Sequence, residues 1–341
     1  MINSDSATNV ASDSRRLRIV IAGGTGQVGT MLSRAFHAEG HDVVSLSRSA
    51  RNAEWRTIVW DARTIGPWTA EIDGADVVIN LAGRSVNCRY NPRNRREILE
   101  SRVQSTRIIG QAIARCEQPP PVWLQASTAT IYAHRFDAAN DEATGVLGGA
   151  EAHAPDTWRF SIDVARAWED AARETVTPRT RQVLLRSAVT MSPDRGGIFD
   201  TLLRLVRLGL GGTNGSGRQY VSWIHDRDFI RAVKWLIENP TLQGPIILAA
   251  PNPLPNAEFM RGLRSAWGTR IGLPSSRWML EVGALLMRTE SELVLKSRRV
   301  YPRRLLESGF TFDFPDWGAA AADLCRRWRN SNGKPENASK P

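Results

Sequence analysis

A hydrophobic run followed at once by a glycine-rich turn constrains the fold of this chain more than any other feature. Residues 17–24 read LRIVIAGG, the β-branched and apolar composition typical of a strand buried on both faces. Residues 25–40 continue TGQVGTMLSRAFHAEG, with apolar side chains at helical spacing until Gly40 ends the segment. A buried strand that turns directly into a helix is typical of α/β proteins with parallel sheets.

The same alternation of strand and helix continues well into the chain. Further buried-strand patterns stand at 41–47, 56–60, 75–83, 121–128 and 181–189, and helical patterns stand at 92–116 and 157–174. Alternation at this spacing predicts a doubly wound parallel sheet with right-handed crossovers. We therefore predict a Rossmann-type α/β domain over residues 17–195.

The pattern loosens after Pro193. We expect a smaller, helix-rich portion over residues 196–328, packed beside the sheet, with the cleft between the two parts as the default ligand site. This portion carries two helical patterns and one strand pattern, at 198–208, from His225 onward and at 244–250. The polar ends, residues 1–16 and 329–341, have the composition of a disordered leader and tail.

Composition narrows the possible functions. The formal net charge is +10, but the basic residues are mostly scattered arginines rather than a basic run, which argues against nucleic-acid binding. The three cysteines are widely separated and the histidines lack metal-ligand spacing, so we expect no metal site. An odd cysteine count fits a reducing cytoplasm. No apolar run reaches membrane-spanning length, so we expect no membrane partner. The expected partner is a small-molecule substrate. No feature of the sequence predicts an oligomeric state.

Three glycines in the first turn have the spacing of a dinucleotide-binding loop. Gly23 permits the tight bend, Gly26 lets the backbone approach a pyrophosphate, and Gly29 lets helix and strand pack closely. The position of the turn, at the start of a series of alternating strands and helices, favours this interpretation over a plain tight turn. The residues of this turn that we predict to bind the dinucleotide are Gly23, Thr25, Gly26, Gln27, Val28 and Gly29.

The end of the second strand indicates which dinucleotide is bound. An acidic residue there would accept a hydrogen bond from a ribose 2′-hydroxyl and repel a 2′-phosphate, but this strand ends in Ser47, Arg48 and Ser49. A guanidinium forks onto phosphate oxygens, and neighbouring hydroxyls donate to the same group. We therefore predict NADP as the cofactor, with Ser47 and Arg48 at its 2′-phosphate; a solvent-facing arginine is the alternative.

Several segments together resemble the extended short-chain dehydrogenase/reductase superfamily, namely IAGGTGQVG, VVSLSRS, DVVINLAG, REILESR and STATIYA. Two others, RLGLGGTNGSGRQYVSWIHDRD and LLESGFTFDFPDWGAAAADL, are more specific and resemble an atypical group called epimerase family proteins. Members of that group end in a small domain of undefined role. The likeness spans about residues 17–324 and implies an NADP-binding, epimerase- or reductase-like protein acting on a small, anionic or sugar-like substrate.

The resemblance implies further cofactor contacts. Asp61 would meet the edge of the adenine, while the backbone of Leu81 and Ala82 would line the adenine ribose. Thr190, after the sixth strand, would lie near the nicotinamide. Two residues of the helical pattern at 92–116 would reach the cofactor or, as the alternative, form a solvated helix face: Glu97 and Arg102.

The catalytic pair of the superfamily is missing. Its chemistry uses Tyr-x-x-x-Lys on the fifth helix, where the tyrosine moves a proton and the lysine lowers its pKa. None of the four tyrosines of this chain has a lysine four residues later. The corresponding positions hold Phe160 and Val164 or, with a one-residue shift, Ser161 and Ala165, and neither choice provides a proton relay.

Four residues remain as candidates for chemistry and substrate binding. Thr128 matches the hydroxyl position of dehydratase-like relatives, although a strand-end hydroxyl more often caps a turn. Tyr132 could supply the proton, although it is usually structural in extended members. Arg218 would hold an anionic group, and His225 is either a substrate contact or a structural histidine. A non-catalytic NADP(H)-binding sensor or scaffold is the alternative function.

Overall fold

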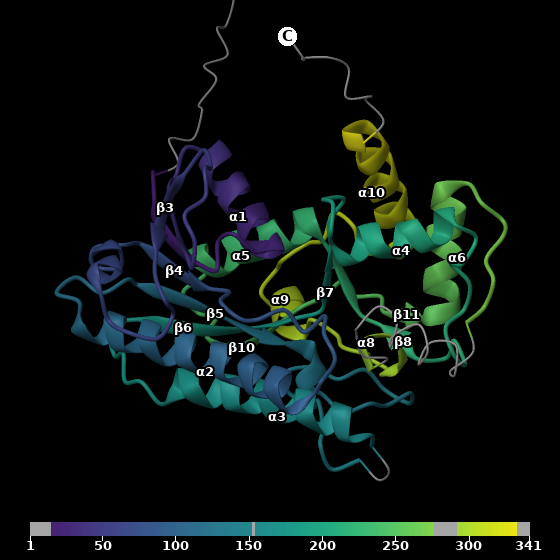
Figure 1. Cartoon of the computed structure of the whole chain (residues 1–341), viewed down its shortest axis with the longest axis horizontal. Helices are drawn as coiled ribbons and strands as arrows, with labels where there is room; N and C mark the ends of the chain where they lie inside the picture. Colours follow the sequence, from purple (N-terminus) through teal and green to yellow (C-terminus); the bar gives the residue numbers. More distant parts are fainter. Residues whose placement is uncertain (1–14, 152–153, 276–291, 333–341) are drawn as a thin grey trace, which may run out of the picture.

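Seven parallel strands form the central sheet of the computed structural model, which describes residues 15–151, 154–275 and 292–332. The strand order is β10-β6-β5-β4-β1-β2-β3 (Figure 1). The strands are β1 (Arg18–Ala22), β2 (Asp42–Ser47), β3 (Arg56–Val59), β4 (Val77–Asn80), β5 (Val122–Thr128), β6 (Arg181–Ser187) and β10 (Gly244–Leu248).

The strand order reverses between β1 and β4. The chain runs outward from β1 to β3, then returns to the other side of β1 and runs outward again through β4, β5 and β6. Ile21 of β1 is accordingly paired with Ser45 of β2 on one side and with Ile79 of β4 on the other. The carboxyl ends of strands at such a reversal form the crevice where ligands bind in doubly wound sheets.

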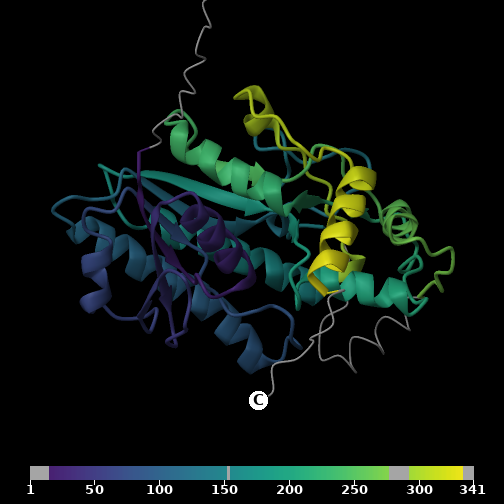
Figure 2. The same cartoon turned by 90° about the horizontal axis from the view of Figure 1, so that it is seen from above.

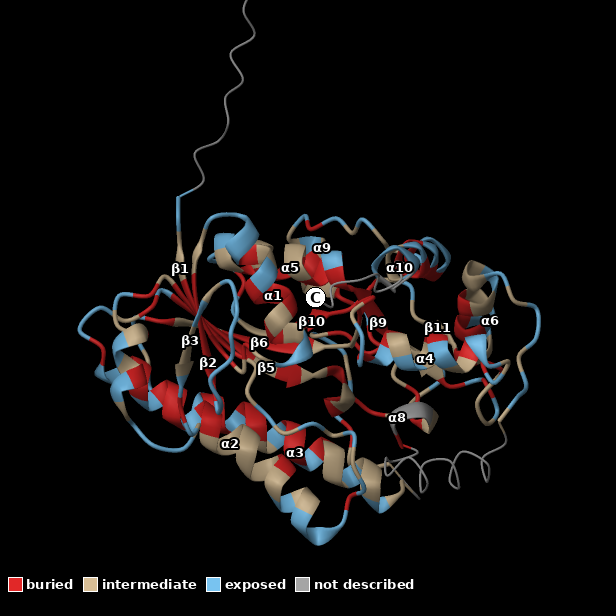
Figure 3. Cartoon of the chain, turned by 45° about the horizontal axis from the view of Figure 1, so that its top comes forward, coloured by how far each residue is buried: buried red, intermediate tan, exposed pale blue. Residues whose placement is uncertain are grey.

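Helices cover both faces of the sheet, as the alternating side chains of buried strands require (Figure 1). One face packs against α1 (Gln27–Ala38) and α5 (Asp226–Glu238). The other packs against α2 (Pro92–Arg115), with α3 (Asp156–Arg173) beside it. Figure 3 shows the sheet strands as largely buried between these layers. The predicted fold class is confirmed.

A second hydrophobic core lies at one end of the sheet (Figures 1 and 2). It is built by α4 (Ile198–Arg207), α6 (Asn256–Trp267) and α10 (Trp317–Asn332). Short elements connect and flank these helices: β7 (Val189–Met191) with β9 (Trp223–His225), β8 (Tyr220–Val221) with β11 (Leu254–Pro255), α8 (Glu292–Leu295), α9 (Arg303–Glu307), and the 3-10 helices η1 (Pro67–Glu71) and η2 (Ala129–Ile131).

Two details differ from the sequence-based boundaries. Strand β10 and helix α5 were expected in the smaller portion, but both are part of the sheet domain. Strand β10 pairs with β6 along five residues, and α5 packs on one face of the sheet. Helix α10 extends to Asn332, so residues 329–332 of the predicted tail are helical. Residues 1–14 of the predicted leader and 333–341 of the tail lie outside the described residues. Over the described part of the chain, no helix is long and apolar enough to span a bilayer.

Candidate functional site

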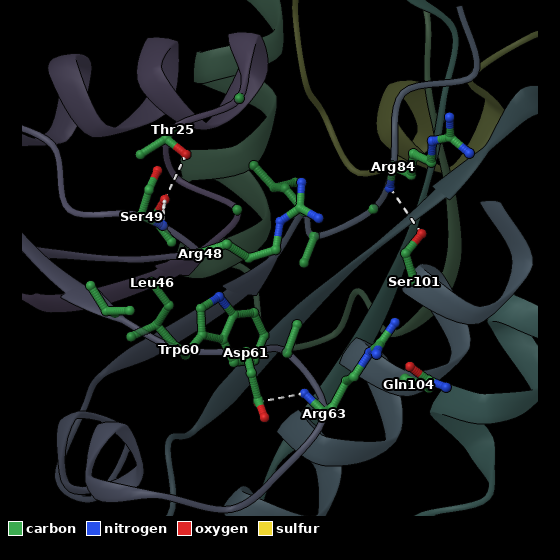
Figure 4. A pocket seen from close by; sticks show the side chains of 18 of the residues that line it. Thr25, Leu46, Arg48, Ser49, Trp60, Asp61, Arg63, Arg84, Ser101 and Gln104 are labelled. Atoms are coloured by element: carbon green, nitrogen blue, oxygen red, sulfur yellow. Dashed lines mark hydrogen bonds between the residues drawn. The ribbon is translucent and has the colours of Figure 1, made fainter. Parts of the chain in front are cut away.

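A cavity of about 1130 Å³ opens at the carboxyl ends of β1 to β4, where the strand order reverses. It receives residues from the glycine turn, the ends of β2 and β3, the loop after β4, and α2 (Figure 4). We call it the cofactor cavity. Eight of the predicted cofactor residues line it: Gly23, Thr25, Gly26, Ser47, Arg48, Asp61, Leu81 and Ala82.

The glycine turn is packed too tightly for a side chain at two of its glycines. Gly23 has φ +78°, and a Cβ there would lie 2.9 Å from the backbone nitrogen of Ala82. A Cβ on Gly29 would lie 2.4 Å from the carbonyl oxygen of Gly23. Helix α1 begins directly after Gly26, which provides no side-chain cap for its first N–H groups. A bare turn at a helix start fits the pyrophosphate of a dinucleotide.

Basic side chains dominate the polar part of the cofactor cavity. Arg48 is exposed at its rim, and within the described part of the chain no carboxylate pairs with it. The hydroxyls of Thr25 and Ser47 are hydrogen-bonded to each other, with 3.0 Å between their oxygens. Arg51 and Arg63, which the motif analysis did not single out, line the same cavity. This concentration of guanidinium groups favours a ligand with several phosphates.

Asp61 lies in the cavity wall, but its carboxylate is engaged in a turn of its own loop. Oδ1 accepts hydrogen bonds from the backbone N–H groups of Arg63 (2.8 Å) and Thr64 (2.9 Å), and Oδ2 accepts one from the Thr64 hydroxyl (2.6 Å). The side-chain and backbone hydrogen bonds from Thr64 lower the pKa of Asp61 to about 2. The carboxylate therefore acts first as a loop anchor, which the sequence alone did not indicate.

A second cavity, of about 400 Å³, lies at the carboxyl ends of β5 and β6. We call it the substrate cavity. It adjoins the cofactor cavity, since Leu81 lines both. The predicted residues that line it without lining the cofactor cavity are Gln27, Val28, Arg102, Thr128 and Thr190.

The two polar residues predicted on α2 have different surroundings. Arg102 lines the substrate cavity, where its Nη1 donates to the carbonyl oxygens of Arg84 (2.9 Å) and Ile98 (3.1 Å). Burial lowers the pKa of Arg102 to about 10. Glu97 lines neither cavity and pairs with Arg93 (2.8 Å) and Arg84 (2.6 Å) at the surface. For Glu97 the contacts support the solvated-face alternative rather than cofactor binding.

A buried polar cluster in the substrate cavity was not found from the sequence. The hydroxyl of Ser161 on α3 donates to Oε2 of Glu292 at 2.6 Å, and the Glu292 side chain is only 1% exposed. Oε1 of Glu292 has no hydrogen-bond partner among the described residues and lies 3.6 Å from Nη2 of Arg298. Burial, with a smaller contribution from the charge of Glu292, raises the pKa of Tyr90 in the same cavity to about 12.

No motif could have revealed this cluster, because Ser161 and Glu292 are 131 positions apart. The only sequence signal was indirect: Ser161 occupies one of the two positions where the superfamily's tyrosine would be expected. Arg298 also donates through Nε to the Thr130 hydroxyl (3.1 Å), which ties the C-terminal segment to the end of β5. The segment that follows α6 in the chain therefore contributes Glu292 and Arg298 to the wall of the substrate cavity.

Of the two predicted catalytic residues, one lines the substrate cavity and the other does not. Thr128 lines the substrate cavity, and its hydroxyl also accepts a hydrogen bond from the Thr130 N–H (3.2 Å) as a turn cap. Tyr132 lines neither cavity: its ring is buried and its hydroxyl accepts from Nη1 of Arg186 (2.8 Å). Burial raises the pKa of Tyr132. These contacts favour the structural role that was the alternative for Tyr132.

The two predicted substrate contacts also lie away from the substrate cavity. Arg218 is exposed on the loop before β8 and lines neither cavity. His225 is fully buried at the start of α5, where Nδ1 accepts from the Arg227 N–H (3.2 Å) and Nε2 lies 3.2 Å from Oδ2 of Asp323. Its ring stacks on Phe314. The structural alternative thus accounts for His225, and neither residue is placed to touch a ligand in the substrate cavity.

Comparison with known families agrees with this architecture. The model of the NAD dependent epimerase/dehydratase family matches residues 19–248. The chain belongs to this family. A second model, of a domain of unknown function (DUF1731), matches residues 276–324 and so includes Glu292 and Arg298 of the substrate cavity. The predicted family and the domain of undefined role at its end are confirmed.

Relatives of similar length share most of the chain. Epimerase family protein SDR39U1 of Bos taurus is 34% identical over 314 residues, which cover 90% of this chain and 99% of the relative. Epimerase family protein YfhF of Bacillus subtilis is 29% identical over 311 residues, with 90% and 98% covered. Both proteins carry only a family-level name, so they identify the group and not a reaction.

Solved structures show the same fold. The crystal structure of human epimerase family protein SDR39U1 (isoform 2) with NADPH matches with a TM-score of 0.79 and 31% identity, covering 91% of this chain and 99% of that one. A nucleoside-diphosphate sugar epimerase from Corynebacterium glutamicum matches with a TM-score of 0.69 and 26% identity, covering 95% and 63%. The prediction of NADP agrees with the ligand of the human relative.

Proposed function

We propose that this protein is an NADP(H)-binding enzyme of the reductase or epimerase type that acts on a small molecule held in the substrate cavity. The observation that carries the proposal is that the two cavities adjoin each other. Leu81 borders both, and the substrate cavity contains Gln27 and Val28 from the start of α1 as well as Thr190 beyond β6. A dinucleotide that lies along the cofactor cavity would therefore direct its nicotinamide toward the substrate.

The residues of the cofactor cavity suit NADP better than NAD. Arg48 has no carboxylate to neutralise it within the described part of the chain, and the hydroxyls of Ser47 and Thr25 stand beside it. A 2′-phosphate would receive charge-assisted hydrogen bonds from these groups. When bound, the nicotinamide supplies a hydride or accepts one. The NADPH in the structure of the human relative supports the same choice.

The buried cluster in the substrate cavity offers a replacement for the missing tyrosine and lysine. Among the described residues no group donates a hydrogen bond to the buried Oε1 of Glu292, whose nearest ion-pair partner is Nη2 of Arg298 at 3.6 Å, so a hydroxyl group of a ligand would find an acceptor there. The hydroxyl of Ser161 is hydrogen-bonded to the Glu292 carboxylate, so it can relay a proton between Glu292 and the oxygen of a ligand in the cavity. Two guanidinium groups, on Arg102 and Arg298, favour a polar or anionic ligand in this small space.

Turnover with Glu292 altered tests the proposal. Purified protein is incubated with NADPH and a panel of small aldehydes, ketones and keto acids, and oxidation of NADPH is followed. For any compound that reacts, we expect Glu292→Gln to lower kcat by about 100-fold or more while NADPH affinity stays unchanged, as loss of a general acid or base does. Glu258→Gln, an exposed change on α6, serves as the matched control. Full activity of Glu292→Gln would remove this residue from the chemistry.

A non-catalytic NADP(H) sensor or scaffold is the second candidate. The observation that favours it is the absence of the tyrosine and lysine pair, together with the burial of Tyr132 against Arg186. Tight NADPH binding without turnover of any compound in the panel would support it.

The three free cysteines, Cys88, Cys116 and Cys325, support our further proposal that the protein works in a reducing compartment such as the cytoplasm.

A further inference from the structure

Gln104 is a polar residue of α2 that faces the cofactor cavity (Figure 4). It lies one helical turn after Ser101, which lines the same cavity and accepts a hydrogen bond from the Arg84 N–H (2.9 Å). That bond holds the loop after β4 against this face of the helix. Gln104 therefore stands on the face of α2 against which this loop is held.

The side-chain oxygen of Gln104 is buried and, among the residues that the structure describes, no group donates a hydrogen bond to it. Leaving a buried acceptor unpaired carries a desolvation cost, and the cost disappears when a ligand supplies a donor. An unpaired oxygen in a cavity wall therefore indicates where a bound molecule carries an N–H or O–H group. The cofactor cavity is the space from which that donor would come.

The adenine end of a dinucleotide carries such a donor in its exocyclic amine. The guanidinium groups that line the cavity cannot accept a hydrogen bond from it, because arginine has donors only. Asp61 is the carboxylate of the cavity, and its oxygens already accept three hydrogen bonds from the loop of Arg63 and Thr64. Figure 4 shows the Asp61 carboxylate turned toward the backbone of Arg63. Gln104 thus offers the amine an acceptor that receives no other hydrogen bond from the described residues.

We propose that Gln104 recognises the adenine of the bound dinucleotide by accepting a hydrogen bond from its amine, and that it makes the site selective for adenine. A primary amide suits the N7 edge of this base, since its oxygen accepts from the amine while its NH₂ donates to N7. On the same edge hypoxanthine carries an oxygen in place of the amine and so presents two acceptors, whereas the amide offers one acceptor and one donor group. The proposal rests on the proposed NADP(H) binding and adds a residue that discriminates between bases.

Binding of two cofactors tests the assignment without any substrate. Dissociation constants of NADPH and of its hypoxanthine analogue, in which oxygen replaces the adenine amine, are measured by calorimetry for wild type and Gln104→Leu. We expect wild type to bind NADPH about tenfold more tightly than the analogue, the ratio for one lost hydrogen bond with a buried group left unpaired. In Gln104→Leu we expect the ratio to fall to about one, through weaker binding of NADPH.

Two further variants keep the test decisive. Gln104→Glu retains an acceptor and should retain most of the preference for adenine, which guards against a folding defect in the leucine variant. Gln111→Leu makes the same chemical change at an exposed position of α2 and should leave both constants unchanged. Equal binding of the two cofactors by wild type, or an unchanged ratio in Gln104→Leu, would overturn the assignment of Gln104 alone. Failure of wild type to bind NADPH would instead overturn the proposed function.

Discussion

Replacing Glu169 with alanine is expected to lower the free energy of unfolding by about 3–5 kcal/mol, the cost of leaving one partner of a buried ion pair alone. Glu169 on α3 and Arg186 on β6 are 1% and 8% exposed, and two hydrogen bonds of 2.8 Å join them. Glu169 also accepts from the Ser127 hydroxyl at 2.6 Å. Removing the carboxylate leaves the buried guanidinium of Arg186 without a counter-charge among the described residues, and with a hydrogen bond to the Tyr132 hydroxyl.

Chemical denaturation of wild type and Glu169→Ala at neutral pH measures this loss. Arg173→Ala is the matched control, because Arg173 pairs with the same carboxylate from an exposed position and should cost less than about 1 kcal/mol. Burial raises the pKa of Glu169, but the hydrogen bond and charge of Arg186 outweigh it, so the net pKa is lowered. The stabilisation is therefore complete above the ordinary pKa of a glutamate and is lost as the pH falls through the lowered value. A difference below 1 kcal/mol at neutral pH would contradict this view of the pair.

Gly29→Ala is expected to weaken NADPH binding by about 100-fold or more, corresponding to about 3 kcal/mol. The added Cβ would lie 2.4 Å from the carbonyl oxygen of Gly23 and 2.6 Å from the Cα of Gly24. Both contacts are with backbone, so the turn itself must move, and the turn is the part of the site that would approach the pyrophosphate. Fluorescence titration with NADPH measures the effect.

The control for Gly29→Ala is Gly318→Ala on α10, where an added Cβ meets nothing within 4 Å. That variant should bind NADPH as wild type does. Thermal unfolding of both proteins separates loss of binding from loss of fold, since α1 and β1 can stay paired while the turn between them shifts. NADPH affinity of Gly29→Ala within threefold of wild type would show that the turn does not touch the ligand.

The sheet and its main helices could be predicted because each is encoded locally. The buried run of β1 and the helical spacing of α1 are readable over a few residues on either side of the glycine turn. The pattern of β10 also indicated a strand, but it could not indicate that the strand joins β6 at the edge of the main sheet. Strands of three residues or fewer, such as β7 and β9, are too short to show a period.

The site was predictable to the extent that its residues are neighbours in sequence. The glycine turn and the Ser47-Arg48 pair each lie within one short segment, and both line the cofactor cavity. The pairing of Ser161 with Glu292 depends on the way the C-terminal segment returns to α3, which no local pattern encodes. Tyr132 and His225 have suitable chemistry, but the sequence does not indicate that their polar atoms face Arg186 and Asp323 rather than a cavity.

Calorimetric titration of wild type and Arg48→Asp with NADPH and NADH measures whether Arg48 binds the 2′-phosphate of NADP(H). We expect wild type to prefer NADPH. In Arg48→Asp we expect NADPH binding to weaken by about 1–3 kcal/mol, the range for lost charge-assisted hydrogen bonds, with NADH binding little changed. Equal losses for the two cofactors, or a wild-type protein that binds neither, would contradict the account.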